Sequence, residues 1–465
     1  MRKHRLVTLA GAGFGLLMAC GGGEKGGTSP NPGITVNGVA KDRYGDPITG
    51  ATVRVPGTTA VTTGADGRFS IPGVLVPYNI ALLPPGEHTA VVYAGLTRAD
   101  PSLLYVAFQG VSKSAWISGT VPPTSGTSTS TVVVFTSGRY VIAGSAADAT
   151  TGDYSFNVQW RGAADTQLGR LYLLRWTADA ISGLPLSYDG YASKALVITA
   201  GSAYNGNDFA AAELIDPPEQ TISGTVAIPP GYNQTFRRLF LYLDAVPVYW
   251  DEVTSVGTFS FTVPAVSGVT FGVGVGAQDL ASRSSWVIKT GISGNSTDVD
   301  LLLLPAAQLT LPANGAPDVD ASTSLSWTEG GGAGVNFVYL IPDGSTSANP
   351  AFVLATTAAH TKIPDLAAEG LGLPATTVYH WAVDRVFPVA SVDDAADDRY
   401  LDLIGWKPSA GGETLSEIFT FTTKAATATA VRASAVGPPT TALQAMRQRA
   451  VMGGAGAPGI PMNHR

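Results

Sequence analysis

Four aspartates near the carboxyl end of the chain form its densest acidic cluster: Asp393, Asp394, Asp397 and Asp398. Calcium in proteins takes about six to eight oxygen ligands, and clustered carboxylates can supply several of them. The cluster therefore suggests the hypothesis that calcium orders this loop, and apart from this structural calcium no cofactor is expected. The competing interpretation is a solvated acidic loop, which is the more usual state of a short charged run.

Aromatic side chains supply a second kind of chemistry, because exposed planar rings stack on sugars whereas buried rings pack a core. Tyr249 and Trp250 are adjacent in the sequence. Neighbouring residues of a strand face opposite ways, so one packed sheet face cannot bury both rings. This pair is therefore the predicted carbohydrate contact, with core packing as the alternative.

Cys20 is the single cysteine of the 465-residue chain, which excludes a disulfide and a cysteine-based metal site within one chain. It follows a basic start and an apolar run from Leu6 to Ala19, the layout of a secretory signal peptide. Leu17-Met18-Ala19-Cys20 resembles the lipobox of bacterial lipoproteins. The resemblance implies cleavage of a signal over residues 1–19, lipidation of Cys20 and attachment to a membrane through that lipid.

The residue after the cysteine carries a further implication of the same resemblance. Lipoproteins with aspartate there stay in the inner membrane, so Gly21 implies the outer membrane and the cell surface. Residues 20–32 are rich in glycine, serine, threonine and proline, and they are predicted to be a flexible tether. The net charge of the chain is −7, and the sequence contains no basic stripe of the kind that binds nucleic acid. We therefore expect no nucleic-acid partner.

Catalytic motifs are missing from the sequence. Outside the predicted signal, the histidines are His88, His360, His380 and His464, and none stands in a His-Glu-x-x-His arrangement. No Gly-x-Ser-x-Gly nucleophile elbow is present either. The stretch 272–277 formally matches a dinucleotide fingerprint, but its alternation of glycine with apolar residues indicates a strand. We expect a protein that is not an enzyme.

The elements that position these residues follow from composition. The chain has 55 glycines and 31 prolines, and only 14% of its residues are charged. Such a composition disfavours long helices and favours short strands joined by turns. We predict an all-β protein made of several tandem β-sandwich domains.

A repeat organises the middle of the chain. The pentapeptide Ile117–Val121 recurs identically at Ile222–Val226, an offset of 105 residues. The same offset relates two further pairs: Phe135 with Phe240, and Ser155–Val158 with Ser260–Val263. Matches in one register predict two homologous sandwiches at 115–218 and 219–304.

A related segment precedes them at 33–114. It has a Gly-Val start, a Gly-x-Pro-x-x-Gly-Ala turn from Gly45 to Ala51, and an Asp-Gly-x-Phe hairpin at Asp66. Asp66 is expected to bond local amides, and Gly67 to take positive φ. The segment resembles a carboxypeptidase regulatory-like domain, which implies a transthyretin-like sandwich related to starch-binding modules, a carbohydrate-binding-like fold.

The last folded unit is predicted at 305–424, with the strand Leu325–Trp327 paired to Val338–Leu340. Its order of motifs resembles a fibronectin type III domain, in which Tyr379 would bond its hydroxyl back to the backbone. Residues 425–465, rich in alanine, threonine, glycine and proline, are predicted to be a disordered tail.

These expectations combine into one interpretation. The chain is expected to be a lipid-anchored envelope protein that displays its sandwiches as a rod, for non-catalytic binding or scaffolding. Its partners would be the membrane, through Cys20, and another surface protein or a polysaccharide. The alternative is a carbohydrate-binding lipoprotein that presents glycan, through residues such as Tyr249 and Trp250, to a separate enzyme.

Overall fold

The computed structural model shows an all-β protein, as the composition predicted. Within the described residues its helices are the four-residue α1 (Val392–Ala395) and the 3-10 turns η1 (Ala211–Glu213) and η2 (Ala367–Glu369). None of the helices in the described ranges is long and apolar enough to cross a bilayer. The structure describes residues 33–42, 45–105, 111–124, 128–138, 141–244, 246–252, 257–343, 349–398, 410–425 and 460–461.

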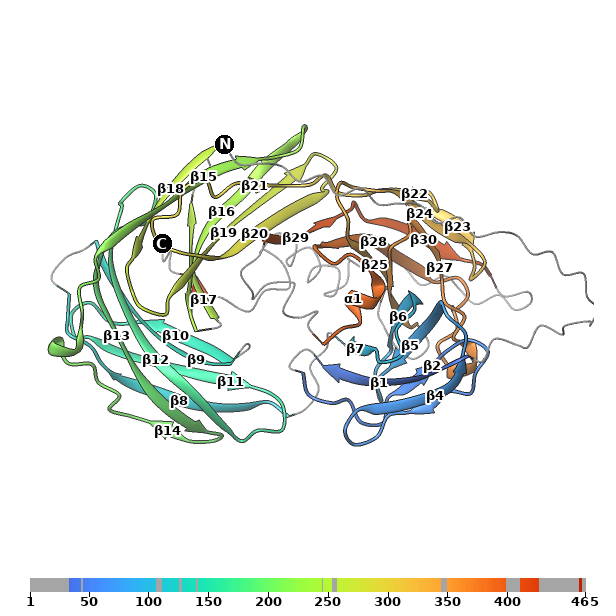
Figure 1. Cartoon of the computed structure of the whole chain (residues 1–465), viewed down its shortest axis with the longest axis horizontal. Coiled ribbons are helices and arrows are strands. Elements are labelled where there is room, and N and C mark those ends of the chain that lie inside the picture. The colour runs from blue at the N-terminus through green and yellow to red at the C-terminus, as the bar shows by residue number, and fades with distance from the viewer. Residues whose placement is uncertain are drawn as a thin grey trace, which may run out of the picture.

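Three successive modules repeat one sheet topology (Figure 1). In each, a central strand pairs antiparallel with one neighbour and parallel with a short second neighbour. The central strands are β1 (Ile34–Asp42), β8 (Lys113–Thr120) and β15 (Glu219–Ala227). Their antiparallel partners are β4 (Arg68–Val74), β11 (Asp153–Trp160) and β18 (Thr258–Pro264), and their parallel partners are β7 (Ser102–Tyr105), β14 (Ala203–Tyr204) and β21 (Leu301–Leu302). We call β1–β7, β8–β14 and β15–β21 the first, second and third modules.

The other strands of each module form a second sheet that packs over the first. In the first module these strands are β2 (Thr52–Arg54), β3 (Val61–Thr62), β5 (Tyr78–Leu83) and β6 (Thr89–Leu96). In the second they are β9 (Thr129–Ser137), β10 (Val141–Ala146), β12 (Thr166–Ala178) and β13 (Pro185–Thr199). In the third they are β16 (Tyr232–Leu243), β17 (Val246–Glu252), β19 (Thr270–Asp279) and β20 (Ser284–Ile292).

Close packing explains the glycine that recurs in the central strand. Gly38, Gly119 and Gly224 pair with an aromatic residue of the antiparallel partner, namely Phe69, Tyr154 and Phe259. A Cβ at Gly38 would lie 2.2 Å from Phe69 Cζ, and one at Gly224 would lie 2.1 Å from the Val299 carbonyl oxygen. Only glycine fits this position, because no real Cβ approaches other heavy atoms so closely.

The fourth module, β22–β30, is also a two-sheet unit. One sheet holds β22 (Gln308–Leu311), β24 (Ser324–Thr328) and β27 (His360–Lys362). The other holds β25 (Val335–Pro342), β26 (Ala351–Thr356), β28 (Val378–Phe387) and β29 (Ala410–Leu415), with β30 (Phe419–Thr423) beside β28 and β23 (Ala316–Val319) beside β30. The predicted pairing of Leu325–Trp327 with Val338–Leu340 is wrong, because the chain crosses from one sheet to the other between β24 and β25. Tyr379 Oη does donate to a backbone oxygen, that of Pro350, at 2.8 Å.

The modules are not strung out as a rod. Strand β26 of the fourth module pairs in parallel with β6 of the first, and β29 pairs with β20 of the third. One sheet of fifteen described strands therefore runs through the first, fourth and third modules. Figure 1 shows the resulting closed arrangement, with the blue first module beside the orange fourth. The expected rod is wrong because the last module returns to the edge of the first.

Neighbouring modules also share hydrophobic cores. On β6, Val91 and Tyr93 join the core of the first module, whereas Ala90 and Val92 join that of the fourth. On β9, Val132 and Val134 pack into the core of the third module. Sheets covered on both faces hold the modules together by burial of apolar surface.

Two further contacts complete the arrangement. A Cβ at Gly162 of the second module would lie 2.2 Å from Asp46 Oδ2 of the first, so these modules also touch. The short strand β31 (Ile460–Pro461) pairs in parallel with β17. The prediction of a disordered tail is wrong for these two residues, and most of 425–465 lies outside the described residues.

Candidate functional site

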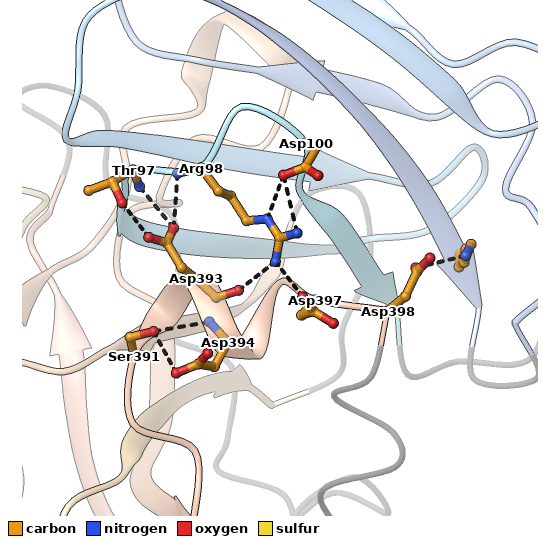
Figure 2. A network of polar contacts seen from close by, with 9 residues as sticks. Thr97, Arg98, Asp100, Ser391, Asp393, Asp394, Asp397 and Asp398 are labelled. Carbon is orange, nitrogen blue, oxygen red and sulfur yellow. Dashed lines mark hydrogen bonds and ion pairs between the residues drawn. The ribbon is translucent and has the colours of Figure 1, made fainter.

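The acidic cluster lies on a loop of the fourth module that docks against the first module (Figure 2). Ser391 caps α1, because its Oγ accepts a hydrogen bond from the Asp394 amide. The same Oγ donates to Asp394 Oδ2 at 2.8 Å. Val392, Ala395 and Ala396 are buried among residues of the first module's core. Apolar packing on one side of the loop leaves the remaining aspartates facing β1 and the turn after β6.

Asp393 is held by that turn. Its Oδ1 accepts hydrogen bonds from the Thr97 amide at 2.8 Å and the Arg98 amide at 3.2 Å. Its Oδ2 accepts from the Thr97 hydroxyl. A single carboxylate thereby satisfies consecutive backbone donors in the way that a capping residue does.

Arg98 is the centre of the network. Its Nη1 donates to the Asp393 carbonyl oxygen at 2.9 Å and to Asp397 Oδ2 at 3.1 Å. Its Nε donates to Asp100 Oδ1 at 3.2 Å. The side chains of Arg98 and Asp397 are each only 19% exposed, so this ion pair is screened less than a surface pair.

Two more contacts fasten the far end of the loop. Lys41 Nζ on β1 donates to Asp398 Oδ1 at 2.7 Å, although that carboxylate is 62% exposed. The Ser102 amide at the start of β7 donates to the Ala396 carbonyl oxygen at 2.7 Å. We call the contacts of Lys41, Thr97, Arg98 and Ser102 with residues 393–398 the intermodule clamp.

The environment favours ionised carboxylates in the clamp. Burial alone would raise the pKa of Asp393, but hydrogen bonds from Thr97 and Arg98 outweigh it and leave the pKa below its usual value. The hydrogen bond from Lys41 is the main cause that lowers the pKa of Asp398. At neutral pH the clamp is a set of charge-assisted hydrogen bonds between two modules.

This geometry corrects the calcium prediction. Asp393, Asp394, Asp397 and Asp398 each point to a different partner, namely Thr97, Ser391, Arg98 and Lys41. Within the described ranges, no group of three or more His, Cys, Asp or Glu side chains is placed to hold a metal ion. The loop is not simply solvated either, because cationic and amide groups of the first module bind its carboxylates.

The carbohydrate prediction for Tyr249 and Trp250 is also wrong, because both rings are buried, at 8% and 0% exposure. Trp250 packs edge-on against Trp176 and Tyr188. Tyr249 lies on the opposite face of β17, where the Arg238 guanidinium sits 4.2 Å from its ring centre. The third module's sheet has apolar clusters on both faces, so the alternation of the strand exposes neither side chain.

No pattern in the sequence predicted the basic half of the clamp. Thr97 and Arg98 lie almost 300 positions before their partner Asp393, and no short motif connects them. The single cysteine, Cys20, lies outside the described residues. Its lipidation stays a prediction.

Comparison with known proteins finds no matching protein family and no matching curated protein. Among solved structures, the chain is weakly similar to the TIE protein of Bacillus anthracis, with 10% identity, a TM-score of 0.16 and coverage of 58% of this chain and 50% of that one. A leucine-rich repeat protein from Bacteroides thetaiotaomicron gives 12% identity, a TM-score of 0.15 and coverage of 41% and 26%. The chain thus spans half or less of the length of either protein.

Proposed function

We propose that this protein is a lipid-anchored, non-catalytic binding or scaffold protein of the bacterial cell envelope. It would hold four β-sandwich modules in fixed relative positions at the membrane surface. Within it, we assign the first module to the carboxypeptidase regulatory-like, transthyretin-like type and the fourth to the fibronectin type III-like type. The turn from Gly45 to Ala51 and the hairpin at Asp66 support the first assignment, and Trp327 and Tyr379 support the second.

One observation carries the scaffold proposal: the sheet that continues through the pairing of β26 with β6 and of β29 with β20. Domains joined only by linkers move independently. Here backbone hydrogen bonds and shared cores cross the module boundaries, and the clamp at Arg98 adds charged contacts. Such a body presents separate surfaces at constant spacing, which is what a scaffold needs.

The anchor proposal rests on Cys20 and its surrounding residues. More than one acyl chain gives stable attachment, since each buried methylene contributes about 0.8 kcal/mol. The glycine-rich residues 21–32 would let the folded body stand away from the bilayer. Gly21 favours the outer membrane, by the sorting pattern of the lipoproteins that the segment resembles.

The test is membrane fractionation of a bacterial host that expresses the full chain. We expect the wild-type protein in the outer-membrane fraction, released by detergent and not by salt. Cys20→Ala should be released from the membrane fraction, and Ser29→Ala in the tether is the matched control that should behave as wild type. A wild-type protein found in the soluble fraction, or a Cys20→Ala variant still extracted only by detergent, would contradict the anchor.

Carbohydrate binding is the second candidate function. Tyr249 and Trp250 no longer support it, since both are buried. Another tryptophan, Trp116, is exposed at 52%. Because exposed aromatic rings can stack on sugars, Trp116 supports carbohydrate binding as the second candidate function.

A further inference from the structure

Trp116 stands apart from the other tryptophans in the described part of the chain. It is 52% exposed, whereas the others are at most 4% exposed: Trp160, Trp176, Trp250, Trp286, Trp327 and Trp381. Its neighbours on β8, Ala115 and Ile117, are 1% and 0% exposed. Strand alternation therefore holds the indole on the outer face of the second module.

The residues around Trp116 on this face are small or polar. Cross-strand register places Asn157 of β11 on one side of the indole and the small Ala203 of β14 on the other. Ser155 and Gln159 of β11 share this face and are exposed. An aromatic plane flanked by hydroxyl and amide groups is the type of lining that fixes and orients a small polar ligand.

Comparison with the third module shows that the fold does not require this indole. The offset of 105 places Thr221 at the position of Trp116, and Thr221 pairs with Thr262 as Trp116 pairs with Asn157. The inward pair is kept, since Ile222 with Phe261 corresponds to Ile117 with Phe156 and all four are buried. Packing of the core explains why the inward-facing residues are the same in both modules. It does not explain why the second module has a tryptophan on its outer face where the third has a threonine.

Charge narrows the class of ligand. Asp153 and Asp208 lie at the end of β8 near Thr120, where Asp208 Oδ1 accepts from the Thr120 amide at 2.8 Å. Lys113, at the other end, bonds the carbonyl oxygens of Gly162 and Ala163 and pairs with Asp165. The carboxylates disfavour an anionic ligand, and both Lys113 and Lys194, which donates to the Asp208 carbonyl oxygen at 2.6 Å, are engaged by groups of the protein itself.

We propose that the outer face of β8, β11 and β14 binds a neutral polysaccharide, with one pyranose ring stacked on Trp116. The C–H face of a pyranose is apolar and matches the indole plane, while its hydroxyl groups reach the exposed side chains of Ser155 and Gln159. This inference names a ligand class for the proposed binding function, and it rests on that proposal for the location of the protein in the cell envelope. The anchor experiment on Cys20 and the binding experiment below can fail independently.

The test measures binding of the mature chain carrying Cys20→Ala to soluble amylopectin, mixed-linkage β-glucan, xyloglucan and galactomannan, with polygalacturonate as the anionic comparison. We expect one or more neutral polymers to bind and to protect tryptophan fluorescence from acrylamide. Trp116→Thr, which recreates the residue of the third module, should weaken binding about tenfold or more and abolish the protection. Leu168→Thr removes another exposed apolar side chain of the same module, 75% exposed, and should leave binding unchanged.

Several results would overturn the proposal. These are no binding of any neutral polymer, equal binding by Trp116→Thr, or binding of polygalacturonate alone. Sedimentation velocity tests whether a second copy of the chain binds this face instead. Self-association that Trp116→Thr abolishes would assign the face to that second copy. Unchanged circular dichroism and melting of Trp116→Thr establish that the variant folds.

Discussion

At the scale of single residues, Arg98 and Lys41 do for the aspartates what a metal ion would otherwise do. Each supplies positive charge at hydrogen-bond distance to a carboxylate of the loop. The consequence differs from that of calcium, because the charges belong to the first module and the aspartates to the fourth. Neutralisation of the cluster therefore joins two modules instead of ordering one loop.

The clamp should depend on pH through Asp393. Its folded pKa lies below the unfolded value of about 3.9, so the charged form stabilises docking above about pH 4. That contribution is lost as the pH falls through the folded pKa. We expect the hydrogen-exchange protection of the Thr97 amide, which donates to Asp393, to stay constant from pH 7 to pH 5 and to drop below pH 4.

Asp393→Asn provides the comparison, because the asparagine amide has nearly the shape of the carboxylate but carries no charge. Its Thr97 protection should be low already at pH 7 and should change little on acidification. The remaining dependence would come from Asp398, whose pKa is lowered chiefly by the hydrogen bond from Lys41. Protection in wild type that is independent of pH down to pH 3 would refute the role of the charge.

At the scale of elements, the central strand of each module is fixed by close contacts on both sides. Gly224 of β15 lies between Phe259 of β18 and the backbone that leads into β21. A side chain there cannot be accommodated by a rotamer change, because the nearest atom is a carbonyl oxygen of the backbone.

Gly224→Ala should therefore destabilise the third module by about 1–3 kcal/mol, the usual cost of overpacking. The measurement is the urea midpoint of the unfolding transition, followed by tryptophan fluorescence. Gly190→Ala on β13 is the matched control, because its Cβ would meet the flexible end of Leu214 at 3.0 Å. Equal effects of the two substitutions would count against the packing explanation.

At the scale of the whole molecule, sheet continuation decides the shape. β6 would be an exposed edge if the first module stood alone, and exposed edges recruit other strands. The chain covers this edge with its own β26. The fourth module thereby links the first to the third, and the linear order of the modules in sequence does not describe their order in space.

This arrangement predicts the solution scattering of the chain over residues 33–425. A compact chain of this length has a radius of gyration of about 21 Å, and we expect a value close to it with a pair-distance distribution that lacks a long tail. Measurements at several concentrations would separate the monomer from any oligomer. The extended scattering profile of a rod would contradict the pairing of β26 with β6.

The sequence by itself determined the local features. Glycine and proline content, alternation and the 105-residue repeat predicted an all-β chain, and the structure confirms it. Asp66 Oδ1 accepts from the Arg68 amide and Gly67 has a φ of 73°, as their residue types predicted. These features are local because a turn or a strand depends on residues a few positions apart.

Only the tertiary structure decided which surfaces are free. Tyr249 and Trp250 became core because a second apolar cluster covers their sheet, and Asp393 became a clamp residue because Thr97 and Arg98 arrive from the first module. Trp116 remained exposed because the three-stranded sheet that carries it packs on one face alone. Burial and partner choice depend on contacts between distant segments, and no pattern within a single strand contains that information.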